Sequence, residues 1–172
     1  MIRVPHIGPL VQVAWVSLSD PYEVNRYATT GWASNYFRNH KLNTEAWDEA
    51  TSEQQRKALT EATDIVDRLN YSGIKTSEDQ PLEFPRGGDL EVPTDIASAC
   101  CEVAYALLDG VDPEIEYENL SMTSQVFGNT KASYDTGSWP ENFSNGVPSF
   151  KAWTYLKPYF ASARNINIVR IS

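Results

Sequence analysis

The sequence predicts a mainly α-helical protein: a small helical bundle with an inserted β-hairpin and extended N- and C-terminal arms. Helical periodicity recurs in several stretches, and a period-two alternation surrounds one Gly-Asn pair, as in a hairpin. At 172 residues the chain has the length of one domain. We divide it into an N-terminal arm (1–18), a helical domain (19–162, with the hairpin at about 117–135) and a C-terminal arm (163–172).

The N-terminal arm is expected to be extended, because two prolines in its first nine residues disfavour a helix. Asp20 and Pro21 then predict a helix start, as N-cap and first helical residue. Gly31 follows two threonines and is expected to end or bend that helix. A second short helical piece is expected over 32–38.

The next helix has the clearest pattern. Thr51 or Ser52 caps its start, it runs to about Asn70, and Gly73 follows as a stop. Its apolar stripe consists of Gln55, Ala58, Leu59, Ala62, Ile65, Val66 and Leu69. Its solvent face consists of Arg56, Lys57, Thr60, Asp64, Asp67 and Arg68. We expect this helix to pack on a core along one side only.

A loop is predicted between residues 71 and 92. Pro81 and Pro85 hold it extended, so that Leu82 and Phe84 point the same way and plug a core. Two consecutive glycines then allow a sharp reversal of the chain. They do not form a phosphate-binding loop, because the GxxxxGK[ST] pattern is absent from the chain.

A third helix is predicted from about Thr94 to Gly110, with an unusually wide apolar arc. That arc contains Ile96, Ala97, Cys100, Val103, Ala104, Leu107 and Leu108. The opposite face contains Ser98, Glu102, Tyr105 and Asp109. An arc this wide predicts burial against two surfaces, either two helices or a helix and a neighbouring subunit. The adjacent Cys100 and Cys101 are expected to be small hydrophobic residues rather than a disulfide or a reactive thiol.

The C-terminal third mixes strand and helix signals. Alternation on both sides of Gly128-Asn129 predicts the hairpin. A last helix is expected from Ser149 to about Lys157, where Pro158 ends or kinks it, with Phe150, Trp153 and Leu156 on one side. Residues 166–172 are rich in β-branched side chains and favour a strand that has no local partner. That strand could pair with a strand of its own chain or add to a sheet edge of another protein.

Charge is unevenly distributed along the chain. The formal net charge is −9, yet residues 78–118 hold twelve acids and one arginine, a net of −11. From residue 142 onward there are four lysines and arginines and no acid. A body this acidic would repel a polyphosphate backbone. Single acids of this kind usually solvate a surface, but twelve together indicate a specific role.

Catalytic and cofactor-binding signatures are absent from the sequence. Only His6 and His40 could act as an imidazole base, and no GxSxG, HExxH, CxxC, dinucleotide or EF-hand pattern is present. We therefore expect no enzyme activity, no cofactor and no metal site. No apolar run approaches the roughly 20 residues that cross a bilayer, so no membrane association is expected. Two adjacent cysteines suit a reducing compartment.

Several segments, taken together and in order, resemble a tailed-bacteriophage family. They are residues 55–64 (QRKALTEATD), 80–86 (QPLEFPR) and 146–153 (GVPSFKAW). The family is that of the head-to-tail adaptor proteins, also called head-completion or connector proteins, and many members carry the label DnaT-like single-stranded-DNA-binding. The resemblance covers roughly residues 17–110 and part of the C-terminal region.

The resemblance implies a structural virion protein, made in the host cytoplasm and located in the neck between head and tail. It implies a ring, typically of twelve copies, that binds the portal protein and tail or nozzle components while double-stranded DNA passes through. The hairpin, at 121–134, would face the tail or the channel. The implied portal contacts are Phe150, Trp153, Tyr155, Ile166, Ile168, Val169 and Ile171. The implied channel-facing acids are Asp112, Glu114, Glu116 and Glu118.

Two other functions remain open at this stage. The first is a single-stranded-DNA-binding protein of the DnaT-like type, because bases stack on aromatic rings beside cations. The basic C-terminal region supplies such rings in Phe150, Trp153, Tyr155, Tyr159 and Phe160. The overall charge of −9 argues against this function. The second, a small hydrolase that uses surface carboxylates, is supported by composition alone.

Overall fold

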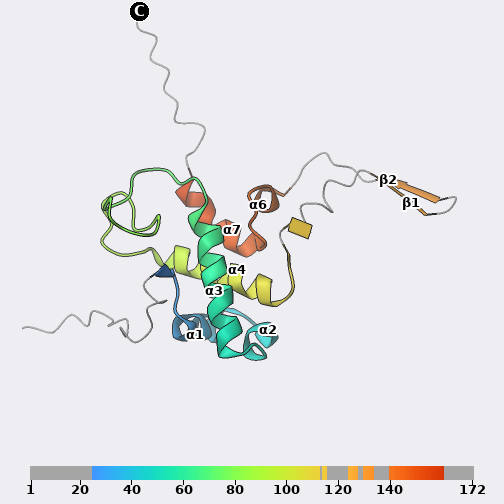
Figure 1. The fold of residues 1–172 in the computed structure, drawn as a ribbon, viewed down its shortest axis with the longest axis horizontal. Coiled ribbons are helices and arrows are strands. Elements are labelled where there is room, and N and C mark those ends of the chain that lie inside the picture. The colour runs from blue at the N-terminus through green and yellow to red at the C-terminus, as the bar shows by residue number, and fades with distance from the viewer. Residues whose placement is uncertain (1–24, 113, 116–123, 128–129, 134–139, 161–172) are drawn as a thin grey trace, which may run out of the picture.

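The structure is a computed structural model that describes residues 25–112, 114–115, 124–127, 130–133 and 140–160 (Figure 1). Its helices are α1 (Thr30–His40), α2 (Glu45–Asp48), α3 (Ser52–Asp67), α4 (Thr94–Leu108), α6 (Glu141–Ser144) and α7 (Phe150–Leu156), followed by the 3₁₀ helix η2 (Lys157–Tyr159). Two short strands, β1 (Ser124–Phe127) and β2 (Thr130–Ser133), complete the elements. The predicted mainly helical class is confirmed.

Helix α4 is the centre of the fold. It packs against α3, α7, α1 and α2, and Figure 1 shows α3 crossing it steeply. Every residue from 96 to 105 is buried. The predicted burial against two surfaces is therefore confirmed, and the covering helices belong to the same chain. The prediction that Ser98, Glu102 and Tyr105 form a polar outer face is wrong, because helices of the same chain cover that side as well.

Helix α1 contains the second helical piece predicted over 32–38, but it begins at Thr30, where the sequence analysis placed the end of a preceding helix. The Thr29 side chain accepts a hydrogen bond from the Trp32 backbone N–H at 3.1 Å and so caps the helix, which continues to His40. Threonine is a weak helix former but a good N-cap, and this second property determines its role here. Gly31 lies in the first turn rather than at a helix end.

Helix α3 confirms the strongest local prediction. The Thr51 side chain and the Gln54 side chain form a reciprocal capping box at its start. The predicted apolar stripe is buried at Ala58, Leu59, Ala62, Ile65 and Val66. One residue on the predicted solvent face behaves differently: the Asp67 carboxylate accepts hydrogen bonds from the Tyr27 hydroxyl and from the Glu83 backbone N–H.

The loop between α3 and α4 inserts an aromatic plug into the core, as predicted. Phe84 is 3% exposed, and its ring makes edge contacts with the rings of Tyr27, Tyr71 and Tyr159. Leu82 is half-buried against the same core. The peptide bond between Phe84 and Pro85 is cis.

Helix α7 starts one residue after the predicted start, because Ser149 is its N-cap: the Ser149 hydroxyl accepts a hydrogen bond from the Ala152 N–H. Trp153 and Leu156 are buried against α4 as expected. Phe150 does not join them: its side chain is 69% exposed. The short helices α2 and α6 were not predicted, since four residues give too little periodicity to detect.

Strands β1 and β2 pair antiparallel, with Ser124 opposite Ser133 and Phe127 opposite Thr130. Among the described residues they form a two-stranded sheet with no further strand. The residues that connect them to the helices lie outside the described part. The prediction that a hairpin at 117–135 is inserted into the helical domain is therefore not supported. The prediction of a mainly helical fold is supported. The predicted N- and C-terminal arms also lie outside the described residues.

Candidate nucleic-acid interface

One side of helix α1 carries a column of three stacked rings. Trp32, Tyr36 and His40 follow at intervals of four residues, which places them on one helix face. The rings of Trp32 and Tyr36 stack with centroids 5.6 Å apart and planes 8° apart. The rings of Tyr36 and His40 stack at 4.9 Å and 24°. Tyr36 is buried, Trp32 is half-buried and His40 is exposed, so the column is accessible at its two ends.

Two lysines meet beside this column on a buried carboxylate. Glu102 of α4 is 2% exposed and accepts hydrogen bonds from Lys151 Nζ at 2.7 Å, Lys41 Nζ at 2.9 Å and the Tyr36 hydroxyl at 2.9 Å. Burial by itself would raise the pKa of Glu102, but the hydrogen bonds from Lys151 and Lys41 outweigh it and hold that pKa below its usual value. Glu102 therefore stays ionised at neutral pH and fixes both ammonium groups.

The lysines also lie against aromatic rings. Lys41 Nζ is 3.5 Å from the Tyr105 ring centroid, and Lys151 Nζ is 5.5 Å from that of Tyr36. Their side chains remain 21% and 43% exposed. Burial, and then the hydrogen bond with Tyr155, raises the pKa of Tyr36, so its hydroxyl keeps its proton. Rings and cations are thus held in one rigid network.

We define this set as the aromatic–cationic face: Trp32, Tyr36, His40, Lys41, Glu102, Lys151 and Tyr155. Its two lysines and one glutamate give a net charge of +1 on a chain whose net charge is −9. Exposed rings next to ammonium groups provide stacking surfaces for bases and counter-charges for phosphates. The chemistry of this face therefore suits a single-stranded nucleic acid.

The three described residues that were expected to bind the portal differ in exposure. Phe150 is exposed at the start of α7. Trp153 is 7% exposed, stacks on Phe160 at 5.0 Å and donates a hydrogen bond from Nε1 to Glu141 at 3.2 Å. Tyr155 is half-buried, and its hydroxyl lies 3.4 Å from that of Tyr36. Of these three residues only Phe150 is exposed, and the assignment to a portal contact stays a prediction.

The remaining predicted site residues are divided between the described and undescribed parts of the chain. Asp112 and Glu114 are exposed and line a cleft beside α3, where the Asp112 carboxylate accepts a hydrogen bond from the Glu114 backbone N–H at 2.9 Å. Six others lie outside the described residues: Glu116, Glu118, Ile166, Ile168, Val169 and Ile171. Their assignment to a channel or a portal contact stays a prediction.

The structure also changes the set of rings available for base stacking in the C-terminal region. Tyr159 and Phe160 pack inward, against Phe84 and Tyr71 respectively, and Trp153 is buried. Sequence reasoning missed the column on α1, although the four-residue spacing of its rings was a usable signal. It had no signal for the contact between Lys151 and Glu102, which are far apart in the sequence.

Neither a metal centre nor a membrane-spanning helix is present within the described residues. No group of three or more His, Cys, Asp or Glu side chains there could hold a metal ion. No helix in the same part of the chain combines the length and apolar character needed to cross a membrane.

The fold and the face define a small helical protein with a surface suited to single strands. The chain belongs to the family described as "Putative DnaT-like ssDNA binding protein", whose match covers residues 20–171. No curated protein and no solved structure matches the chain. The family match contradicts the predicted function of a head-to-tail adaptor. It also contradicts the expectation that the chain is a structural connector protein of a bacteriophage. It supports the alternative that the sequence analysis left open.

Proposed function

We propose that this protein binds single-stranded DNA through the aromatic–cationic face. The observation that carries the proposal is the column of Trp32, Tyr36 and His40 next to the ammonium groups of Lys41 and Lys151. A base stacks on the accessible faces of Trp32 or His40, and the neighbouring phosphates lie near the two lysines. The DnaT-like family membership supports the same ligand.

The small net charge of the face limits the electrostatic contribution. Two lysines can neutralise at most two phosphates, so log K should fall with log salt at a slope of about −1.4, that is 0.7 for each phosphate of a single strand. This corresponds to about a sevenfold loss of affinity between 50 and 200 mM salt. Stacking, which tolerates any base, should therefore supply most of the affinity and little sequence preference.

The direct test is fluorescence anisotropy of a dye-labelled oligothymidine of about 15 nucleotides, a length within the site sizes known for single-strand binders. We expect Trp32→Leu to weaken binding roughly 5- to 150-fold, the equivalent of about 1–3 kcal/mol for one lost stack. Lys151→Gln should reduce the salt slope by about 0.7. Circular dichroism of each variant checks that the helices remain folded.

Lys57→Gln is the matched control. Lys57 lies on α3, its side chain is 71% exposed, and it pairs only with the exposed Glu53 among the described residues. We expect this variant to bind DNA as the unmodified protein does. Equal loss of binding in Lys57→Gln and Lys151→Gln would show that the face has no special role, and unchanged binding in Trp32→Leu would remove the stacking mechanism.

A further inference from the structure

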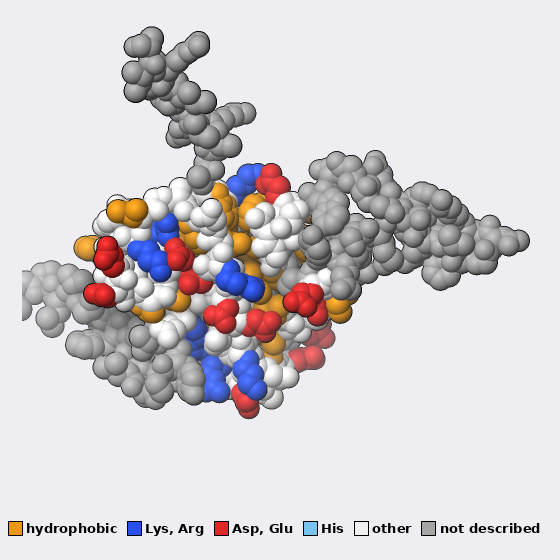
Figure 2. All heavy atoms as spheres, turned by 45° about the horizontal axis from the view of Figure 1, so that its top comes forward, with side chains coloured by type: hydrophobic (Ala, Val, Ile, Leu, Met, Phe, Trp, Pro, Cys, Tyr) orange, Lys and Arg blue, Asp and Glu red, His pale blue; other side chains and the backbone are white. Residues whose placement is uncertain are grey.

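A cleft lies between α3, the end of α4 and α6. It has a volume of about 1170 Å³. Typical small-molecule sites measure roughly 300–1,000 Å³, so this cleft is large enough for a segment of polypeptide. Its apolar lining comes from Ile65, Leu69, Leu107, Val111 and Phe143. Figure 2 shows apolar side chains accessible in the middle of one face, with acidic side chains beside them.

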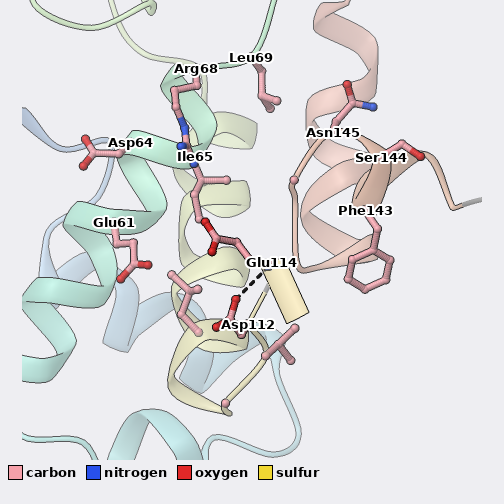
Figure 3. Close-up of a pocket in the computed structure, with 14 residues that line it drawn as sticks. Glu61, Asp64, Ile65, Arg68, Leu69, Asp112, Glu114, Phe143, Ser144 and Asn145 are labelled. Carbon is pink, nitrogen blue, oxygen red and sulfur yellow. Dashed lines mark hydrogen bonds between the residues drawn. The ribbon is translucent and has the colours of Figure 1, made fainter. Parts of the chain in front are cut away.

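The rim of the cleft is acidic. Glu61 and Asp64 project from α3 on one side, and Asp112 and Glu114 follow α4 on the other (Figure 3). None of the salt bridges among the described residues uses these four carboxylates. Arg68 is the one basic residue among the described residues that line the cleft, so the lining contains four acidic side chains and one basic side chain. The matching ligand is an apolar segment that carries arginines at its ends.

We propose that residues 161–172 of the same chain bind in this cleft as an extended segment. The segment contains two arginines and no acidic residue. Side chains alternate between two faces in an extended chain. Arg164, Ile166, Ile168 and Arg170 therefore share one face, with the two isoleucines between the two arginines. This order matches an apolar lining between acidic rims.

The position of Phe160 explains why the chain's own segment is the occupant. Phe160 forms a backbone bridge with Tyr71, and its ring stacks on the Tyr71 ring at 5.1 Å. Leu69, which lines the cleft, is two residues before Tyr71. Two residues span at most about 7 Å, so the segment begins next to the cleft. Its twelve residues can extend up to about 40 Å, which is ample to reach along the lining.

The arginines suit the rim for a further reason. A guanidinium group can form two parallel hydrogen bonds to one carboxylate, and such pairs are stronger than single neutral hydrogen bonds. Four carboxylates with one arginine among them leave places for two more guanidinium groups. The proposal concerns the cleft alone and does not depend on DNA binding.

The experiment uses the full chain with a nitroxide spin label on Asn167→Cys, in the middle of the segment and on the face opposite Ile166 and Ile168, and a diamagnetic analogue as the reference. Cys100 and Cys101 are fully buried, so the label reacts at the introduced thiol. In the ¹⁵N spectrum of the labelled chain, diluted with unlabelled protein, we expect selective signal loss at the amides of Leu69, Leu107 and Gly146. No loss at these amides would overturn the proposal.

Two matched double variants test the predicted face. Ile166→Asn with Ile168→Asn should abolish the signal loss, because it removes the apolar contacts with the cleft. Val169→Asn with Ile171→Asn alters the opposite face and should preserve the signal loss. The reverse pattern would contradict the proposed orientation and overturn the proposal. The same result in both double variants, whether the signal loss is preserved or abolished, would overturn it as well.

A mixed sample distinguishes the chain's own segment from that of a second copy. It combines ¹⁵N-labelled protein without a spin label and unlabelled protein with one. Signal loss at the cleft in this sample would mean that a second copy supplies the segment, and the proposal would be wrong. We expect none. Because no nucleic acid is present, failure here leaves the proposed DNA binding to its own test.

Discussion

Replacement of Glu102 by glutamine would test the network that holds the aromatic–cationic face. The carboxylate is 2% exposed and accepts hydrogen bonds from Tyr36, Lys41 and Lys151. Glutamine keeps the shape and one acceptor oxygen but removes the negative charge. Both ammonium groups would then face a neutral group inside a partly buried site.

The expected loss of stability follows from the burial of the partners. Removing one member of a fully buried ion pair costs about 3–5 kcal/mol, because it leaves a charge without compensation. Here the lysine side chains are 21% and 43% exposed and can turn toward water. We therefore expect Glu102→Gln to lower the free energy of unfolding at pH 7 by about 2 kcal/mol.

The effect should depend on pH in a defined direction. The folded-state pKa of Glu102 lies below its ordinary value of 4.5, so ionised Glu102 stabilises the fold above that value. This stabilisation is lost as the pH falls from 4.5 through the lower folded pKa, because protonated glutamate resembles glutamine. The difference between the unmodified protein and Glu102→Gln should therefore be full at neutral pH and shrink in acid.

Urea unfolding followed by circular dichroism, at pH 7 and at several acidic pH values, measures this difference. Glu53→Gln is the control: Glu53 pairs with Lys57 on the surface, and its loss should leave the urea midpoint unchanged. An equal midpoint for Glu102→Gln at pH 7, or a difference that grows in acid, would refute the reasoning. If the face binds DNA as proposed, the same variant should bind more tightly, because its charge rises from +1 to +2.

Two further predictions concern the core. Phe84→Ala should lower the free energy of unfolding by about 3–5 kcal/mol, because it removes a buried ring that three tyrosines surround. Phe150→Ala should change the free energy of unfolding little, because the Phe150 side chain is exposed. Similar urea midpoints for the two variants would contradict the described core. Burial raises the pKa of the Cys100 thiol to about 12, and Cys101 is equally inaccessible, so Ellman's reagent should modify neither thiol until the protein unfolds. Rapid modification of the folded protein would show that α4 is not covered as described.

Local signals in the sequence predicted some features well. The cap at Thr51, the start of the last helix near Ser149 and the apolar stripe of α3 depend on residues within a few positions of each other, and the structure confirms them. At Thr29 the local signals were ambiguous, because threonine is both a weak helix former and a good N-cap. The helix start there was read as a helix end.

Polar residues on the expected outer faces were the main source of error. Glu102 and Asp67 have the sequence context of solvated residues, yet each accepts hydrogen bonds from a tyrosine on another element. Whether such a residue is buried depends on which helix covers that side, and no periodicity within one helix contains this information. The same limit explains why the sequence analysis placed the exposed Phe150 on one side of its helix with Trp153 and Leu156, which are buried.

The sequence by itself determined that the chain is mainly helical and where α3, α4 and α7 begin, because caps, prolines and apolar spacing act over a few residues. Only the tertiary structure decided that α4 is covered by its own chain, and that Lys41 and Lys151 meet on Glu102 beside the rings of α1. Those contacts join residues 61 and 49 positions apart, and packing of whole helices, not local preference, sets which distant side chains meet.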